Sequence, residues 1–470
     1  MGCGNAVTVF SHPFFIVERR SLFRFWKHCF KKPAAGLSSA DRSTKTMSSA
    51  NTYYYEQLNK EGRQVYHAML NGLTAIEPSF AVPRLDGKNL AEIYFLVRMD
   101  HPEIFYTTRF TYRYYKDADS VELIPDYLFP KAKIREHQLA MNSRVKKIIN
   151  QAAALKTEED KVLFVHDFLV EHVYYDKLKK PYSHEIIGAL GNGVAVCEGI
   201  AKSVKVLLDA MGIWCILALA DNNPQKGIKY RHTWNLVKLG KTYYHLDATF
   251  DNSLTRENRR SMNQNTQPED GREADVLKTS SASGQKASSA KKQEPLIRRD
   301  YCLLSDTQIY RDHEPSMYRL PACTVADHSY YRTKKLSFTK MEEVLNRTGQ
   351  AIRKKKPLVF HWRGGYLTRK VLIEMLGVIS EAALEKDRQA FVSVNWPQAV
   401  VFVHFADLTE EQKAKLTAEK KLLEGEIPEK RRDAETDTDV PSETEEQLRK
   451  DLEGILQMEE ANEGERYEGE

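Results

Sequence analysis

Three residues between Gly191 and Asp251 have the types and the spacing that nucleophilic catalysis needs. Cys197 follows a run of small apolar residues at the expected start of a helix over 197–211. The unpaired amides at a helix N-terminus favour negative charge, so a thiol there ionises more readily and an oxyanion can be held beside it. Because an isolated cysteine is more often a small buried residue, the catalytic interpretation needs partners for this thiol.

A predicted β-hairpin supplies two partners. Apolar and polar residues alternate over 231–239 and 242–250, on both sides of a turn at Gly240-Lys241. In that register His232 and Asp247 are diagonal neighbours on one face of the sheet, within reach of a hydrogen bond. A nucleophile, a base and an orienting carboxylate form the triad of covalent catalysis. We therefore expect the cysteine to act as nucleophile, His232 as base and Asp247 as the group that orients the base.

Three segments resemble signature motifs of the transglutaminase-like superfamily. They are Gly193-Val-Ala-Val-Cys197-Glu-Gly-Ile-Ala, His232-Thr-Trp-Asn and Lys241-Thr-Tyr-Tyr-His-Leu-Asp247-Ala-Thr-Phe. Upstream, residues 166–176 look like the helix and exit that precede this core in bacterial members. The resemblance covers about residues 158–255, with residues 300–312 as its expected continuation beyond the insertion. It implies acyl transfer through a thioester and an α+β, papain-like fold in which the cysteine helix packs on an antiparallel sheet.

Several residues near the triad have expected supporting roles. Glu198 and Gly199 belong to the nucleophile motif, and Trp234 is expected to shield the imidazole from water, to pack in the core, or both. Three residues differ from those common in the family but remain large and apolar: Ile200, Tyr243 and Phe250. We interpret them as packing variants. An upstream donor to the oxyanion is left open among Tyr182, Ser183 and His184.

Two further side chains could compete for these roles. In the predicted register His245 shares a face with Asp247, and we expect it to have a structural hydrogen bond or packing role instead. Cys215 falls in an apolar run over 213–220 that reads as a buried strand, so its thiol should be inert.

The elements around the site predict the domain organisation. Helices are expected over 131–153 and 158–174, before the cysteine helix. The expected domains are a disordered leader at 1–46, an N-terminal helix and strand region at 53–153, a core at 154–325 with a disordered insertion at 256–294, a smaller C-terminal α/β unit at 335–406, and a charged, mostly disordered tail at 410–470.

Composition limits the other classes of function. The 470 residues are 41% hydrophobic and 29% charged, an ordinary globular balance. The net charge of +5 conceals a tail over 421–470 with 18 acidic and 7 basic residues. Neither a zinc finger nor a recognition helix accompanies the basic remainder, so we expect no nucleic-acid partner. The six cysteines are scattered without a CxxC pair, which argues against a disulfide scaffold and favours a reducing compartment such as the cytoplasm.

The sequence lacks the patterns of membrane segments, secretory signals and calcium-binding loops. We find no apolar run long enough for a membrane helix, no secretory signal and no EF-hand loop, and so expect no integral membrane segment, no metal and no cofactor. The expected partner is a protein or peptide, attacked at a glutamine carboxamide or a peptide bond, with an amine or water as acceptor. A cysteine peptidase or amidase on the same fold and a non-catalytic interaction module remain alternatives.

Overall fold

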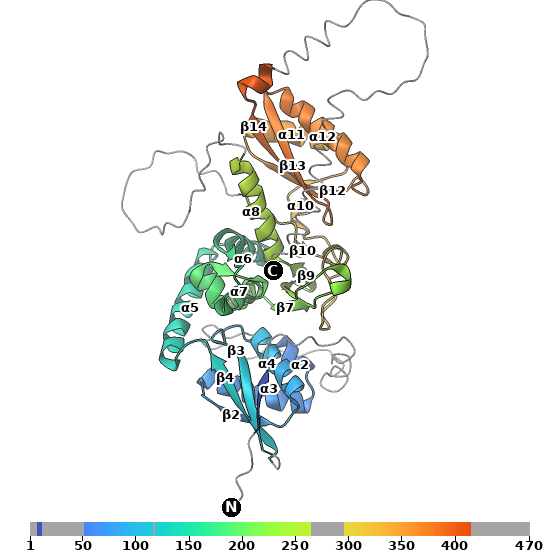
Figure 1. The fold of residues 1–470 in the computed structure, drawn as a ribbon. Coiled ribbons are helices and arrows are strands. Elements are labelled where there is room, and N and C mark those ends of the chain that lie inside the picture. Colours follow the sequence, from blue (N-terminus) through green and yellow to red (C-terminus); the bar gives the residue numbers. More distant parts are fainter. Residues whose placement is uncertain (1–6, 12–50, 116–117, 265–295, 415–470) are drawn as a thin grey trace, which may run out of the picture. The chain divides into compact units, whose positions relative to one another are not determined.

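The structure is a computed structural model that describes residues 7–11, 51–115, 118–264 and 296–414 (Figure 1). The chain forms two compact units. The first consists of Met1–Asp221, Arg231–Thr255 and Ile297–Tyr330, and the second of Asn222–Tyr230, Arg256–Leu296 and Tyr331–Glu470. Within the described ranges no helix has the length and apolar character needed to span a bilayer.

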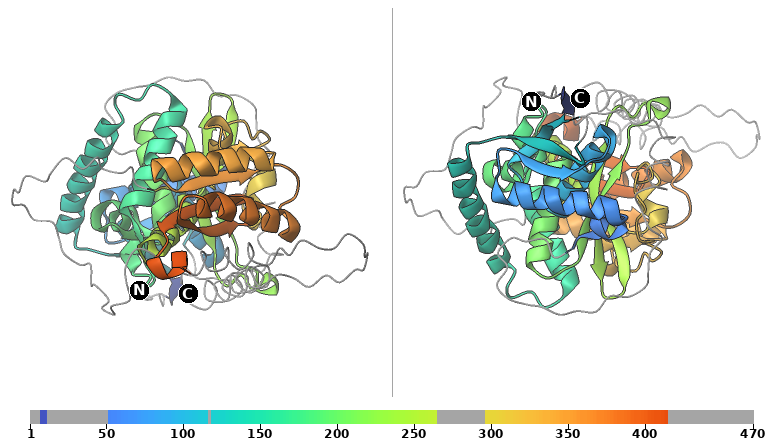
Figure 2. Two further views of the ribbon diagram at one scale, coloured as in Figure 1. Left: turned by 90° about the horizontal axis from the view of Figure 1, so that it is seen from above. Right: turned by 90° about the horizontal axis from the view of Figure 1, so that it is seen from below.

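The N-terminal part of the first unit is a four-stranded antiparallel sheet with helices packed against it. Its strand order is β1-β3-β4-β2. Helices α3 and α4 pack together, and α3 also contacts β2 (Figures 1 and 2). The elements are β1 (Val7–Ser11), α2 (Tyr53–Gln57), α3 (Lys60–Ala75), β2 (Phe80–Pro83), α4 (Gly87–Asp100), β3 (Thr107–Tyr114) and β4 (Ser120–Tyr127).

Strand β1 corrects the expectation of a disordered leader over 1–46. Val7 lies opposite Tyr114 and Ser11 opposite Phe110, so β1 extends the sheet at β3. The segment Val-Thr-Val-Phe is rich in the β-branched and aromatic residues that favour a pleated strand. The rest of the expected leader, 1–6 and 12–46, lies outside the described residues.

The core of the first unit packs helix α7 against a second four-stranded sheet, of order β10-β9-β8-β7. The side chain of Asn235 on β8 donates a hydrogen bond to the carbonyl of Ala201 on α7 (2.9 Å), which ties helix to sheet. This is the α+β arrangement that the sequence predicts. Its elements are α5 (Lys131–Gln151), α6 (Glu158–His172), β5 (Tyr174–Tyr175), β6 (Val194–Ala195), α7 (Cys197–Ala210), β7 (Cys215–Ala220), β8 (His232–Leu239), β9 (Thr242–Leu246), α8 (Ala248–Gln264), β10 (Cys302–Leu304) and α9 (Asp306–Ile309).

The β8–β9 hairpin has the predicted register but a shorter second arm. Asn235 lies opposite Leu246, and Leu239 opposite Thr242, as the turn at Gly240-Lys241 requires. The predicted strand over 242–250 is wrong beyond residue 246, because α8 begins at Ala248. The predicted start of the disordered insertion, at residue 256, is also too early, because α8 continues to Gln264. Residues 265–295 lie outside the described ranges.

The second unit contains a small α/β fold. The sheet has the order β11-β12-β14-β13, in which β11 and β12 are parallel and are joined by α11. Helices α11 and α12 lie side by side (Figures 1 and 2). On the C-terminal half of α8, Asn258 and Ser261 bind Ser393 and His404 of the sheet. The elements are β11 (Ser337–Phe338), α11 (Met341–Lys354), β12 (Leu358–Trp362), α12 (Arg369–Leu384), β13 (Arg388–Asn395) and β14 (Val400–Asp407).

Glycine at position 199 lets α7 approach the preceding loop closely. A Cβ atom at Gly199 would lie 2.2 Å from the carbonyl oxygen of Ser183 and 3.2 Å from that of Glu185. Both obstacles are backbone atoms, which cannot rotate away. The supporting role of Gly199 is therefore one of packing, because the missing side chain lets the first turn of α7 lie against the backbone of Ser183 and Glu185.

We expect Gly199→Ala to destabilise the protein by about 1–3 kcal/mol, because the added methyl group forces backbone apart. Thermal unfolding followed by circular dichroism measures the effect. The matched control is Gly349→Ala in α11, where a Cβ atom meets nothing within 4 Å; this change should stabilise by about 0.5–1 kcal/mol through helix propensity. Equal effects of the two substitutions would contradict the close approach.

Candidate active site

Cys197 is the first residue of α7, as the sequence predicts. Val196 precedes it as the N-cap in an extended conformation, and its amide donates to the carbonyl of Ser183 (3.1 Å). The amides in the first turn of a helix have no intrahelical acceptor and carry partial positive charge. Cys197 is partly exposed, whereas the other cysteines of the described ranges are buried: Cys215, Cys302 and Cys323. Its thiol therefore combines access with a favourable local field.

His232 lies between the thiol and a buried carboxylate. Its Nε2 atom is 2.6 Å from Oδ2 of Asp247, and the side chain of Cys197 is close enough to its ring to contribute to its pKa. Because Nε2 is engaged by Asp247, Nδ1 is the ring nitrogen left for the thiol. Burial alone would lower the pKa of His232, but the charge and hydrogen bond of Asp247, with a contribution from Cys197, raise it to about 10. The imidazole is therefore held in its protonated form at neutral pH.

Asp247 sits at the junction between β9 and α8. Its Oδ1 atom accepts from the backbone amides of Thr249 (2.7 Å) and Phe250 (3.2 Å), so the carboxylate caps α8. Its own amide donates to the carbonyl of Tyr301 (2.9 Å). His232 and Asp247 thus meet, but not as diagonal neighbours within a hairpin. The chain leaves the strand before Asp247, and capping of the next helix fixes the carboxylate instead.

A second histidine, His313, binds the same carboxylate oxygen. Its Nε2 atom is 2.9 Å from Oδ2 of Asp247, and its Nδ1 atom is 2.8 Å from Oδ1 of Asp312. Both ring nitrogens face carboxylates, which only accept, so both must carry protons. Burial would lower the pKa of His313, but the hydrogen bonds with Asp247 and Asp312 raise it above the usual value. Together the two histidines outweigh the effect of burial on Asp247 and hold its pKa below the usual range.

Sequence reasoning missed His313 because no local pattern marks it. It lies 66 positions from Asp247 and follows the short helix α9. Strand β10 brings this segment to the site by pairing with β9, where Cys302 lies opposite Leu246. Only the expected continuation of the family resemblance over 300–312 pointed to this part of the chain, and it stopped one residue short.

Trp234 and His245 form a second network behind the imidazole. The indole of Trp234 stacks on the His232 ring, with centroids 5.8 Å apart and planes 11° from parallel. Its Nε1 atom donates to Nδ1 of His245 (2.9 Å), whose Nε2 atom lies 2.8 Å from Oδ1 of Asp306. Trp234 thus packs in the buried core and also covers one face of the His232 ring. His245 binds Asp306 rather than Asp247, which agrees with its expected structural role.

Glu198 binds basic side chains around the first turn of α7. Its carboxylate binds Lys202 (2.8 Å) and Nδ1 of His184 (3.1 Å), and it lies 3.6 Å from Arg98. Burial would raise its pKa, but these partners, with Lys202 contributing most, hold the pKa well below its usual value. Lys202 and Arg98 also bind the buried Glu185. The first turn of α7 is therefore fixed by a buried network of opposite charges.

Two of the three candidates for the upstream oxyanion donor have other partners. The hydroxyl of Ser183 donates to Asp176, and the ring of His184 is bound to Glu198. Tyr182 lies under the ammonium group of Lys180, 5.8 Å from its ring centroid. This contact leaves the Tyr182 hydroxyl able to donate, and the amides at the start of α7 are further donors for an oxyanion.

Comparison with known proteins identifies a family for part of this chain. Residues 146–248 match the family model of the transglutaminase-like superfamily. The chain carries a transglutaminase-like domain. A solved structure described as a TGase is 15% identical, with 36% of this chain covering 48% of that chain and a TM-score of 0.21. A candidate protease from Parabacteroides distasonis is 16% identical, with 28% of this chain covering 29% of that chain and a TM-score of 0.19. The chain thus spans about half or less of these proteins. No curated protein matches it significantly.

The transglutaminase-like domain over residues 146–248 relates this part of the chain to the papain-like cysteine enzymes. Two groups of its described residues bring metal-binding atoms within 4.8 Å of one another: His232, Asp247 and His313, and His245, Asp306 and Cys323. In both groups histidine nitrogens already have hydrogen-bond partners: Nε2 of His232 binds Asp247, both nitrogens of His313 face carboxylates, and both nitrogens of His245 are bound. We therefore assign both groups to hydrogen-bond networks, and the expected absence of a metal or cofactor stays a prediction.

We expect Asp247→Asn to lower the pKa of His232 from about 10 toward the usual 6.5, because it removes the negative charge that stabilises the imidazolium. NMR titration of the protein labelled with 15N-histidine measures the change. The His232 resonance is assigned by its loss in His232→Gln.

The matched control is His313→Leu, which removes the second donor and leaves the Asp247 carboxylate in place. In this variant the pKa of His232 should stay high, because its partner keeps its charge. If His313→Leu lowers the pKa of His232 as much as Asp247→Asn does, the two histidines act as one unit. The carboxylate would then not be the deciding group.

Proposed function

We propose that the transglutaminase-like domain transfers acyl groups through a thioester on Cys197, with His232 as base and acid and Asp247 as the group that orients it. The observation that carries the proposal is the position of His232, whose Nε2 atom lies 2.6 Å from Oδ2 of Asp247 and whose ring is close enough to Cys197 for that side chain to contribute to its pKa. The start of α7 supports it, because free amides there can hold the oxyanion of a tetrahedral intermediate. The acyl donor is a glutamine side chain or a peptide carbonyl of a protein.

The steps follow from the positions of these groups. The sulfur of Cys197, its proton held by His232, attacks the carbonyl carbon and forms a C–S bond. The C–N bond then breaks, and the imidazolium of His232 gives its proton to the departing amine or ammonia. An amine or water next attacks the thioester carbonyl carbon and gives its proton to His232. The C–S bond then breaks, and the released sulfur of Cys197 shares that proton with His232 again. Asp247 keeps the ring oriented and stabilises its charge throughout.

The other cysteines of the described ranges are poorly suited to this role. Burial, followed by the negative charge of nearby carboxylates, raises the pKa of Cys215, Cys302 and Cys323. A buried thiol with a raised pKa is a weak nucleophile. This contrast favours Cys197 as the thioester-forming residue.

Two alternatives make different products. A cysteine peptidase or amidase on this fold would hydrolyse the thioester, whereas a transglutaminase would pass the acyl group to an amine. A non-catalytic interaction module would make neither product, and it would not require a histidine shared between a thiol and a carboxylate. Mass spectrometry of peptides containing glutamine and lysine, together with ammonia release, separates the three outcomes.

We expect a graded loss of turnover across four substitutions. Cys197→Ala should abolish it, and His232→Ala should reduce it about a thousandfold because base and proton source are lost together. Asp247→Asn should be milder, since the amide oxygen can still cap α8 and the amide nitrogen can still hydrogen-bond the ring, although it selects another tautomer and cannot stabilise the cation. His245→Ala should retain most activity, because His245 binds Asp306.

The rate constants are compared on the same peptide, with circular dichroism to check folding. An inactive His245→Ala beside an active His232→Ala would reassign the base. Full turnover in Cys197→Ala would remove the thioester from the mechanism.

A further inference from the structure

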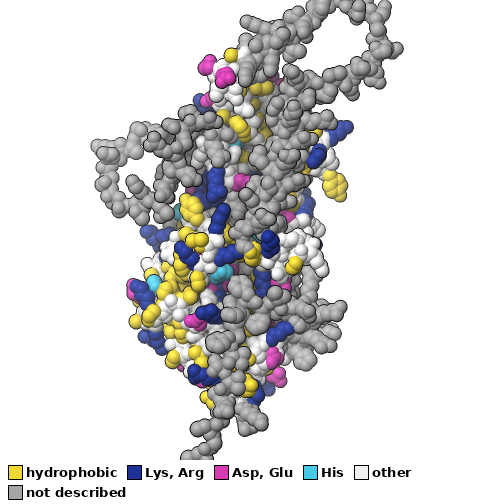
Figure 3. Space-filling view, viewed as in Figure 1, with side chains coloured by type: hydrophobic (Ala, Val, Ile, Leu, Met, Phe, Trp, Pro, Cys, Tyr) yellow, Lys and Arg dark blue, Asp and Glu magenta, His cyan; other side chains and the backbone are white. Residues whose placement is uncertain are grey.

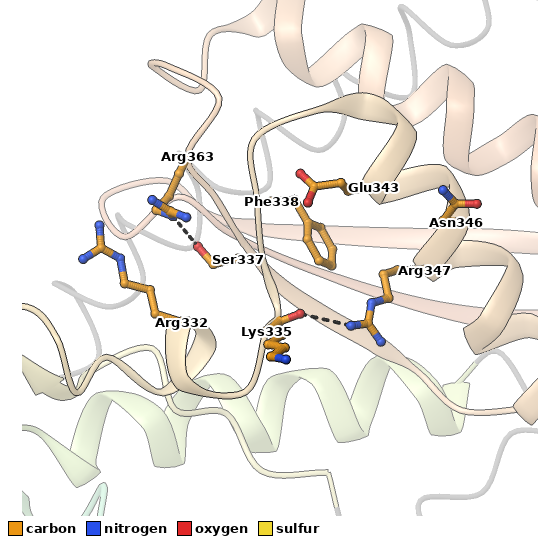
Figure 4. A pocket seen from close by; sticks show the side chains of 8 residues that line it. All are labelled: Arg332, Lys335, Ser337, Phe338, Glu343, Asn346, Arg347 and Arg363. Carbon is orange, nitrogen blue, oxygen red and sulfur yellow. Dashed lines mark hydrogen bonds between the residues drawn. The ribbon is translucent and has the colours of Figure 1, made fainter.

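A pocket of about 720 Å³ lies within the second unit, and none of the triad residues line it. The pocket lies beside the edge strand β11. Its lining residues come from the segment before β11, from β11 itself, from α11 and from the residue that follows β12 (Figure 4). In Figure 4 Arg332 and Arg363 lie on one side of Ser337, and Arg347 on the other. The lining residues are Arg332, Lys335, Ser337, Phe338, Glu343, Asn346, Arg347 and Arg363.

The lining is strongly basic, with four cationic side chains and one carboxylate. That carboxylate already has partners: Oε2 of Glu343 accepts from the backbone amides of Thr339 (2.8 Å) and Lys340 (3.1 Å) at the start of α11. These amide hydrogen bonds, the one from Thr339 first, lower the pKa of Glu343. On the face drawn in Figure 3, by contrast, Lys and Arg side chains are scattered among other types. The pocket therefore concentrates positive charge.

The guanidinium groups of Arg347 and Arg363 are positioned by neutral atoms rather than by carboxylates. Nε of Arg363 donates to the hydroxyl of Ser337 (2.7 Å), and Nη2 of Arg347 donates to the carbonyl of Lys335 (3.2 Å) (Figure 4). The ammonium group of Lys335 has no partner among the residues that the structure describes. Such contacts orient the groups without neutralising them, so their charge remains available to a ligand.

We propose that this pocket binds the phosphate group of a small organic phosphate. Arginine presents a planar set of donors that matches phosphate oxygens, and three of the four cations are arginines. The hydroxyl of Ser337 and the amide of Asn346 add neutral polar groups, and Phe338 supplies an apolar surface. The volume falls in the range of about 300–1,000 Å³ of small-molecule sites and exceeds what a bare phosphate ion needs.

The test is calorimetric titration of the full chain with inorganic pyrophosphate. We expect saturable binding that Lys335→Gln weakens about tenfold, because a charge-assisted contact is lost. Arg363→Gln should weaken it at least as much, and it provides a second variant should one misfold. The matched control is Lys334→Gln, an exposed neighbour outside the lining, which should change the affinity by no more than about twofold through long-range charge.

Two further titrants identify the source of the phosphate. Vesicles of phosphatidylcholine with phosphatidic acid, compared with phosphatidylcholine alone, report a lipid phosphate; binding that depends on Lys335 would assign the same chemistry to a lipid. A glutamate hexapeptide reports general attraction of acidic chains. The proposal is overturned if neither pyrophosphate nor the phosphatidic acid vesicles bind, if Lys334→Gln weakens binding as much as Lys335→Gln, or if the hexapeptide binds as tightly as pyrophosphate.

Discussion

The carboxylate of Asp247 is the group on which the candidate site depends. One oxygen caps α8, and the other receives both His232 and His313. A single side chain therefore sets where β9 ends, where α8 begins and how the imidazole faces the thiol. Because Asp247 is 1% exposed, its negative charge requires these partners, and the partners in turn are held by it. The Asp247 carboxylate therefore determines both the charge of the site and the local path of the chain.

The elements around this carboxylate are fixed by further buried charges. His166 on α6 bridges Asp251 of α8 (3.0 Å) and Asp167 (2.9 Å), which joins the two helices behind the site. Burial would lower the pKa of His166, but these two carboxylates raise it to about 9. On the other side, Lys202 and its acidic partners hold the start of α7. Buried charges of this kind are costly unless paired, so the network favours one arrangement of Cys197 and His232 over slightly shifted ones.

The sequence predicted those parts of the site that depend on local patterns. The start of α7 at Cys197 and the β8–β9 register follow from a helix signal and from a turn with alternating arms. It failed where contacts between distant segments decide the structure. Asp247 was placed in a strand because the alternation continues past it, whereas the capping of α8 ends the strand. His313 could not be found, because strand pairing through β10 brings it to the site. Strand β1 was missed because five residues in a basic leader carry a weak signal.

Acyl transfer is proposed to pass through a covalent bond to Cys197. Intact-mass spectrometry of the full chain, acid-quenched after mixing with a glutamine-containing peptide, tests it most directly. The account predicts a mass increase equal to the peptide minus ammonia, mapped to Cys197 and removed by hydroxylamine, as a thioester requires. A product formed without such an adduct, or an adduct that persists in Cys197→Ala, would contradict it.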